Sequence, residues 1–166
     1  MSWARQLPWL APAPALAGGH TARADLPRVL AQGKTWQRDA ILVHLSSTTV
    51  LPDGTAPEWK YAFYSPATGK RCVVTARKGG VTTKEVRLGN HTEPLGEFVD
   101  SDQAMGVARK NGLKGGEPSM ALARPTGAGA DGTRWLVSGG FKDGDTSISV
   151  EARTGAFAGR AIMGKD

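Results

Sequence analysis

The chain has 166 residues, of which 40% are hydrophobic and 22% charged, a composition typical of a globular protein. No apolar run reaches the roughly 18 residues that a membrane-spanning helix requires, so no membrane span is expected. The net charge of +6 is uneven: residues 1–90 carry 12 Lys/Arg against 5 Asp/Glu (+7), and residues 91–166 carry 9 against 10 (−1). A basic first half favours a partner with a negative surface.

Residues 1–20 form a segment rich in Pro and Ala, in which Pro8, Pro12 and Pro14 interrupt the apolar core that a signal peptide needs. We therefore expect an extended arm and slightly favour a cytoplasmic location. The alternative is a weak, cleaved signal sequence, which would place the protein outside the cytoplasm.

Residues 21–90 are expected to form a first structural unit. Asp25 and Pro27 suit a helix start, Leu26, Val29 and Leu30 form its apolar stripe, and Gly33 weakens its end. Strands are then expected at residues 40–49, 59–64, 71–77 and 81–88, where β-branched and aromatic residues concentrate.

Residues 91–99 are interpreted as a linker, and residues 100–166 as a second unit. Asp100 and Gln103 resemble a capping box, and Asn111-Gly112 supplies a left-handed helix end. Strands are expected at residues 119–123, 135–138, 146–152 and 156–162, and alternation is clearest in the third of these. The predicted order is a helix followed by an antiparallel meander.

An internal repeat relates the two halves, at a constant spacing of 76 positions. Trp59 corresponds to Trp135, Cys72 to Ile148, and the run 76–79 to the run 152–155. The repeat predicts two similar units that pack on each other, because each alone would have a thin core.

The second half carries a family resemblance. An acidic helix start, a tryptophan strand and the run Glu151-Ala152-Arg153-Thr154-Gly155 resemble the PepSY and PepSY-like domains, over residues 100–162 and more weakly over 25–88. The resemblance implies an α+β fold: two tandem cystatin-like units, each a short helix on a meander of three to four strands. It also implies a role in inhibition, regulation or protein binding, and it brings no catalytic residues.

Candidate contact residues lie in the first half. Trp59, Tyr61 and Phe63 share one face of a predicted strand, where they either pack in the core or form a stacking surface for a partner. Six cationic residues cluster within 18 positions nearby. The candidate partner-binding residues are Trp59, Tyr61, Phe63, Tyr64, Lys70, Arg71, Arg77, Lys78, Lys84 and Arg87.

The chemistry of an active site is not assembled in the sequence, and no cofactor or metal is expected. Cys72 is the single cysteine, which excludes an internal disulfide, and its alignment with Ile148 favours a buried thiol over a nucleophile. His44 aligns with Leu122 and is expected to be packed. The loop at residues 112–116 and the turn at 143–145 lack the contexts of a phosphate or calcium site.

These observations favour a non-enzymatic binding or scaffold protein, an accessory subunit that docks onto another protein in a larger complex. The charge of the first half suits an acidic partner. A peptidase inhibitor is one alternative. Nucleic-acid binding by the basic first half is a second, less favoured one.

Overall fold

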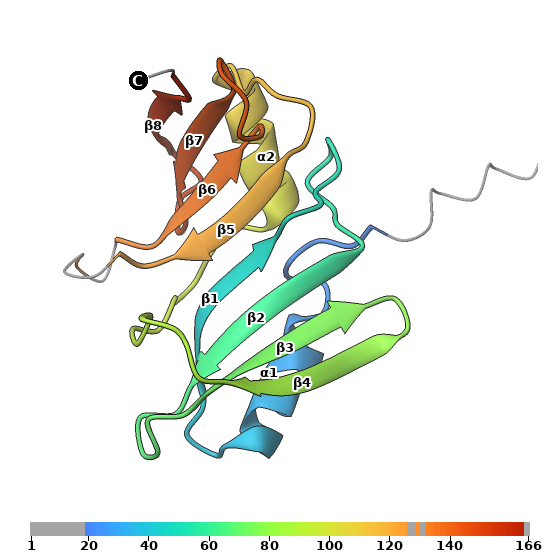
Figure 1. Cartoon of the computed structure of the whole chain (residues 1–166), viewed down its shortest axis with the longest axis vertical. Helices are drawn as coiled ribbons and strands as arrows, with labels where there is room; N and C mark the ends of the chain where they lie inside the picture. Colours follow the sequence, from blue (N-terminus) through green and yellow to red (C-terminus); the bar gives the residue numbers. More distant parts are fainter. Residues whose placement is uncertain (1–18, 126–128, 130–131, 165–166) are drawn as a thin grey trace, which may run out of the picture.

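The computed structural model describes residues 19–125, 129 and 132–164; all but the last two residues of the predicted N-terminal arm thus lie outside the described residues. The described elements follow one order along the chain, a helix and then four strands, and this order occurs in both halves (Figure 1). They are α1 (Leu26–Trp36), β1 (Ile41–Ser47), β2 (Glu58–Tyr64), β3 (Arg71–Arg77), β4 (Gly80–Val86), α2 (Ser101–Lys110), β5 (Ser119–Ala123), β6 (Arg134–Ser138), β7 (Thr146–Glu151) and β8 (Phe157–Ile162).

All eight strands belong to one antiparallel sheet, in the order β4-β3-β2-β1-β5-β6-β7-β8. The first strand of each half, β1 and β5, pair in the centre, with Leu45 opposite Leu122. This sheet is larger than the separate meanders of three to four strands expected from sequence. Pairing between β1 and β5 satisfies backbone groups that two separate sheets would leave on open edges.

Both helices lie on the same face of the sheet (Figure 1). α1 packs against β1 and β3, and α2 packs against β6 and β7. The other face carries no helix, so the described part of the chain has a helix layer and an open sheet face. None of its helices is long and apolar enough to cross a membrane.

Gly33 lies in the last turn of α1, which ends at Trp36. A Cβ atom at this position would lie 2.6 Å from Cε1 of Phe63. The glycine therefore lets the helix backbone approach the sheet closely. In α2 the expected bounds are confirmed, and Gly112 has a φ of 84°. The predicted capping box is not formed: the Asp100 carboxylate accepts from the Ser101 N–H (2.8 Å), and the Gln103 N–H donates to Asp102 Oδ1 instead (2.8 Å).

The core lies between the sheet and the two helices, and the repeated tryptophans meet at its centre. Trp59 and Trp135 are fully buried, with ring centroids 6.1 Å apart in an edge-to-face arrangement. Each indole N–H donates to a backbone carbonyl before a helix, that of His20 (2.8 Å) or that of Val99 (2.9 Å). One core therefore spans both halves.

The aromatic stripe of β2 belongs to this core. Trp59, Tyr61 and Phe63 share a face, as predicted from alternation, and are 0%, 0% and 1% exposed. The Tyr61 hydroxyl donates to the carbonyl of Ala22 at 2.6 Å, which satisfies its polar group inside the core. The three side chains therefore pack in the core, and they do not form a stacking surface for a partner.

His44 is packed as expected, but against His91 and on the side of the sheet away from the core, unlike Leu122, with which the sequence aligns it. Strand β1 has a register irregularity between Leu42 and His44, and such a bulge shifts the alternation of all later residues by one. As a result Leu45 is the residue that pairs with Leu122 in the core, and His44 lies on the open face.

Candidate functional site

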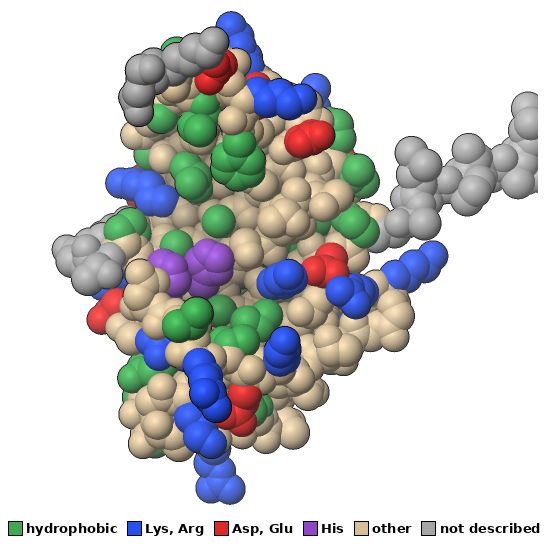
Figure 2. Space-filling view, viewed as in Figure 1, with side chains coloured by type: hydrophobic (Ala, Val, Ile, Leu, Met, Phe, Trp, Pro, Cys, Tyr) green, Lys and Arg blue, Asp and Glu red, His purple; other side chains and the backbone are tan. Residues whose placement is uncertain are grey.

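The face of the sheet opposite the helices is the candidate site, and we call it the open face. Because side chains alternate along a strand, the residues between the buried ones must point to it. At its centre β1 and β5 contribute His44, Ser46, Ala121 and Ala123. The space-filling view looks onto this face, with the histidines near its middle (Figure 2).

The two halves of the open face differ in chemistry. Over β2 to β4 the outward side chains include four cations among uncharged residues such as Val73 and Thr75, and the Lys and Arg side chains gather there in Figure 2. Over β5 to β7 they are mostly small, apart from Leu136, which is 47% exposed, and from Arg134 and Glu151, which lie opposite each other at the ends of β6 and β7. The cationic set is Lys60, Arg71, Arg77 and Lys84, with Glu58 opposing them; the small set is Ser119, Ala121, Ala123, Ser147 and Ser149.

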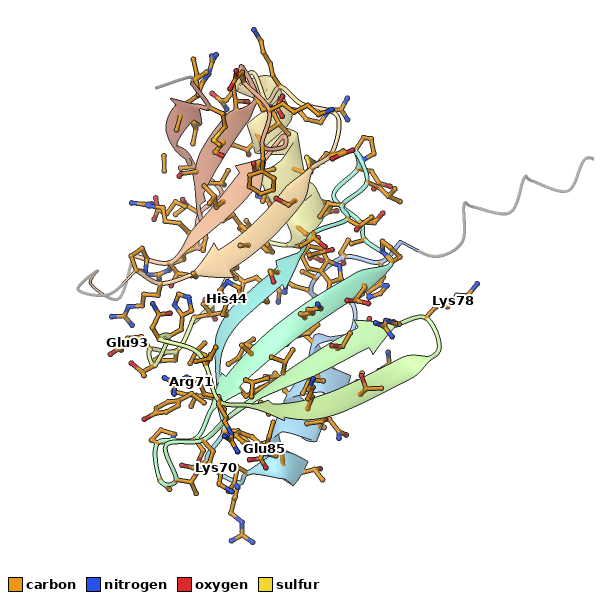
Figure 3. All side chains as sticks on the ribbon, viewed as in Figure 1. His44, Lys70, Arg71, Lys78, Glu85 and Glu93 are labelled. Carbon is orange, nitrogen blue, oxygen red and sulfur yellow. The ribbon has the colours of Figure 1, made fainter. Side chains whose placement is uncertain are left out.

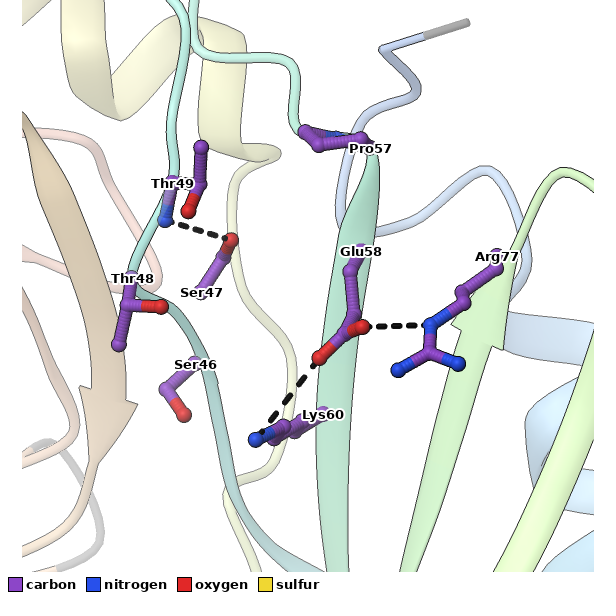
Figure 4. Close-up of a pocket in the computed structure, with 8 residues that line it drawn as sticks. All are labelled: Ser46, Ser47, Thr48, Thr49, Pro57, Glu58, Lys60 and Arg77. Carbon is purple, nitrogen blue, oxygen red and sulfur yellow. Dashed lines mark hydrogen bonds and ion pairs between the residues drawn. The ribbon is translucent and has the colours of Figure 1, made fainter.

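A polar pocket of about 260 Å³ lies at the rim of the cationic half (Figure 4). Glu58 sits between two cations: Oε2 lies 2.5 Å from Arg77 Nε, and Oε1 lies 3.7 Å from Lys60 Nζ. The hydroxyl groups of Ser46, Ser47, Thr48 and Thr49 line the other side. Two cations on one carboxylate leave this corner positive, and it can accept a further carboxylate.

A second cluster lies at the opposite ends of these strands. The rings of His44 and His91 stack, with centroids 5.0 Å apart and planes 20° from parallel. The Arg71 guanidinium lies 4.6 Å from the centre of the Tyr64 ring and donates to the carbonyl of His91 at 3.5 Å. Figure 3 shows Arg71 and His44 on this side of the sheet. The cluster fixes the segment that follows β4 against the sheet.

Burial lowers the pKa of His44, and the charge of His91 lowers it further. Desolvation disfavours the imidazolium form, and a second imidazolium in stacking contact would repel it. His44 is therefore held neutral at neutral pH, which suits flat packing and leaves the cationic character of this face to Lys and Arg.

The other candidate cations lie around the edge of the first half. Lys70 and Glu85 approach to 3.7 Å (Nζ to Oε1), so part of this charge is neutralised locally. Lys78 is exposed at the turn between β3 and β4, and Arg87 is exposed just after β4. In Figure 3 Lys78 and the Lys70–Glu85 pair lie at opposite ends of the β3–β4 hairpin. The ten predicted residues are thus divided between core, open face and sheet edge.

Two exposed residues of this face, Lys60 and Leu136, were missed from sequence. Lys60 lies between Trp59 and Tyr61, and Leu136 between Trp135 and Val137, all four of which are buried. Alternation alone places a residue between two core residues on the opposite face. That signal was available once the tryptophan strands had been recognised.

The cysteine thiol and the Tyr61 hydroxyl are sequestered in the core. The Cys72 thiol is fully buried, and burial raises its pKa to about 12. Burial also raises the pKa of Tyr61. His20 lies 2.8 Å from Asp25 (Nε2 to Oδ2), whereas His44 packs on His91. Among the described residues no group of three His, Cys, Asp or Glu side chains is arranged to hold a metal ion.

On the helix side, a groove of about 540 Å³ runs between the N-terminal ends of the two helices. The Arg23 guanidinium lies 5.8 Å from the centre of the Phe98 ring, and the backbone N–H of Arg23 donates to Asp100 Oδ1 at 3.0 Å. These contacts join the segments that enter α1 and α2. We interpret the groove as part of the packing between the halves.

Comparisons with known proteins identify the fold alone. No protein-family model and no curated protein matches the chain. One crystal structure, a protein of Clostridium difficile 630 described provisionally as a lipoprotein, superposes with a TM-score of 0.57 at 15% identity. The match covers 82% of this chain and 91% of that one, so the similarity extends over most of both molecules.

Proposed function

We propose that this protein is a non-enzymatic binding protein that docks its open face onto an acidic surface of another protein. The observation that carries the proposal is the one-sided architecture: one sheet of eight strands has both helices on one face, and in the described part of the chain no helix lies on the other. In a protein of this size, a wide exposed sheet face with a projecting leucine is a natural contact surface.

The dimensions of the open face suit a protein partner. Eight strands spaced about 4.8 Å apart span about 34 Å, and strands of five to seven residues are about 17–23 Å long. The resulting area of roughly 700 Å² is close to the roughly 800 Å² that each partner contributes to a standard interface. The charge of one half selects acidic partners, and the small side chains of the other half allow close approach to Leu136.

A nucleic-acid ligand is the weaker candidate for this face. Sequence-independent binding of single strands depends on exposed aromatic rings on which bases stack. Trp59, Tyr61 and Phe63 are buried, and Tyr64 is covered by Arg71. The cations alone would supply only a phosphate contact whose affinity falls steeply with salt.

In this proposal the two halves are tandem PepSY-like, cystatin-like units, each a helix on four strands, joined through β1 and β5. The recurring element order and the contact between the repeated tryptophans support this assignment. The similar fold of a protein described as a lipoprotein makes a location outside the cytoplasm the first to test.

The test uses Ala121→Arg, which places a long charged side chain at the centre of the open face. Ala31→Arg, on the exposed side of α1, is the matched control. Tagged wild type and both variants are used to isolate partners from native cells, with and without nuclease. We expect wild type and Ala31→Arg to retain the same protein, and Ala121→Arg to lose it.

Retention of one partner by all three chains would contradict docking through the open face. Partners that vanish on nuclease treatment would support the nucleic-acid alternative. A peptidase as the retained partner would make the protein an inhibitor or regulator, and its activity with and without the bound chain would then be compared.

A further inference from the structure

The edge strand β4 is a second surface, distinct from the open face. It ends the sheet on one side and pairs with β3 through all seven residues, from Arg71 opposite Val86 to Arg77 opposite Gly80, without an irregularity. An edge strand in regular register presents every second N–H and C=O away from its neighbour. Figure 1 shows β4 at the rim of the molecule.

The opposite edge, β8, is less suited to pairing. Its ladder with β7 has a register irregularity between Ser149 and Val150. Irregularities of this kind twist an edge and interrupt its outward hydrogen-bonding row. The regular edge of the sheet is therefore in the basic half.

Three cations surround β4 and form no ion pair within the described part of the chain. Lys78 lies before its first residue, Lys84 within it and Arg87 after its last, and all three are exposed. Beyond Arg87, Leu88 is 88% exposed, the highest value among the exposed large hydrophobic side chains described. An edge strand with these neighbours offers backbone pairing, cations within it and beyond both of its ends, and one apolar contact at its end. The acidic residue of β4, Glu85, is paired with Lys70 at 3.7 Å.

We propose that β4 binds an extended acidic segment of a partner protein as a ninth strand of the sheet. Backbone hydrogen bonds along β4 supply the pairing, Lys78, Lys84 and Arg87 face carboxylates of the segment, and Leu88 contacts an apolar side chain beyond one end. A second copy of this chain is the wrong occupant, because its own β4 would bring like charges together. The proposal does not require the open face to bind anything.

The competing interpretation is protective: lysines on an edge strand hinder unwanted pairing. The two interpretations differ in one measurable respect, which is whether the backbone N–H groups of a bound peptide form hydrogen bonds with β4. A strand added to an edge forms hydrogen bonds through alternate N–H groups only. An acidic peptide held by charge alone has no such periodicity.

The experiment uses the full-length, ¹⁵N-labelled protein and a blocked heptapeptide, Glu-Thr-Glu-Val-Glu-Thr-Glu. Two further peptides carry N-methyl groups on alternate residues, one on the odd and one on the even positions. We expect the unmethylated peptide to shift the β4 amide signals. One methylated peptide should bind about tenfold more weakly or worse, equivalent to about 1.4 kcal/mol or more, and the other within about twofold.

Equal binding of all three peptides, loss of binding with both methylated peptides, or no binding of the unmethylated one would each overturn the proposal. The charge requirement is tested with Lys78→Gln/Lys84→Gln/Arg87→Gln against the matched triple Lys110→Gln/Lys114→Gln/Lys142→Gln. We expect about tenfold weaker binding for the first triple only, and equal effects would contradict it.

Ala121→Arg separates this inference from the proposed function. It leaves β4 unchanged, so it should bind the heptapeptide as wild type does even where it loses a partner docked on the open face. A loss of peptide binding in Ala121→Arg would place the peptide on the open face and overturn the edge assignment.

Discussion

His44 packs its imidazole against that of His91 and is half-buried on the open face. Its pKa is lowered by burial and then by the charge of His91, so the folded chain binds a proton at this site more weakly than the unfolded chain does. The unfolded value is about 6.5, and folding stability is full above it and declines as the pH falls below it. Arg71, bound to the His91 carbonyl, adds positive charge to the same cluster.

We therefore expect wild type to lose stability between pH 7.5 and pH 5.5, measured by urea unfolding. His44→Gln keeps a polar side chain on the open face without the titration, and it should lose less stability over the same interval. Both chains retain His20 and its contact with Asp25, so that pair cancels in the comparison. Equal pH dependence in the two chains would show that the His44–His91 stack does not carry the effect.

Cys72 provides a second prediction at this scale, because its thiol is fully buried with a pKa of about 12. A thiol with that pKa is about one part in ten thousand thiolate at pH 8, against about a quarter for a free cysteine. We expect a thiol reagent to modify the native protein at least about a thousandfold more slowly than the urea-unfolded protein. Rapid labelling of the native chain would mean that β3 opens readily.

At the scale of the elements, Gly33 in α1 and Gly106 in α2 form a matched pair. A Cβ at Gly33 would meet the Phe63 ring at 2.6 Å, whereas one at Gly106 has no neighbour within 4 Å. Gly→Ala in a helix normally stabilises by about 1 kcal/mol, and forcing a methyl group into a packed contact costs about 1–3 kcal/mol.

Gly106→Ala should therefore raise the free energy of unfolding by up to about 1 kcal/mol, and Gly33→Ala should lower it by up to about 2 kcal/mol. Chemical denaturation of both variants measures the two effects. Stabilisation by both substitutions would show that α1 can move away from β2 at little cost.

The elements themselves were largely predictable, and their pairing was not. β3 and β5 occur at the predicted bounds, because alternating apolar residues bounded by turn residues report a strand locally. The pairing of β1 with β5 has no local signal, since the paired residues lie 73 to 79 positions apart in the chain. The bulge before His44 also has no signal in the composition, and it places His44 on the face opposite Leu122, with which the sequence aligns it.

Part of the open face could likewise have been predicted, and part could not. The alternation beside Trp59 and Trp135 implies that Lys60 and Leu136 point outward. The stacking of His44 on His91 depends on the path of the segment after β4 across the ends of the strands. Long-range contacts determine that path. The hydrogen bond from the Leu95 N–H to the Leu42 carbonyl, at 3.1 Å, is one of these.

At the scale of the whole molecule, the halves share both a sheet and a core. Trp59 contacts Trp135, and Phe98 also packs edge-to-face on Trp135 at 6.1 Å. Elements that share a buried core tend to open together, whereas independent units open separately. The repeat by itself is compatible with either behaviour, so cooperativity between the halves is a property to measure.

Trp135→Phe tests this coupling, because it removes the indole bond to the Val99 carbonyl and reduces the contact with Trp59. We expect a loss of about 1–3 kcal/mol in stability. Native-state hydrogen exchange should show this loss equally at the most protected amides of β2 and β3 and at those of β6 and β7. The reciprocal variant Trp59→Phe should behave in the same way. If each substitution lowers protection only in its own half, the two halves fold independently, and the contact between β1 and β5 is a docking of finished units.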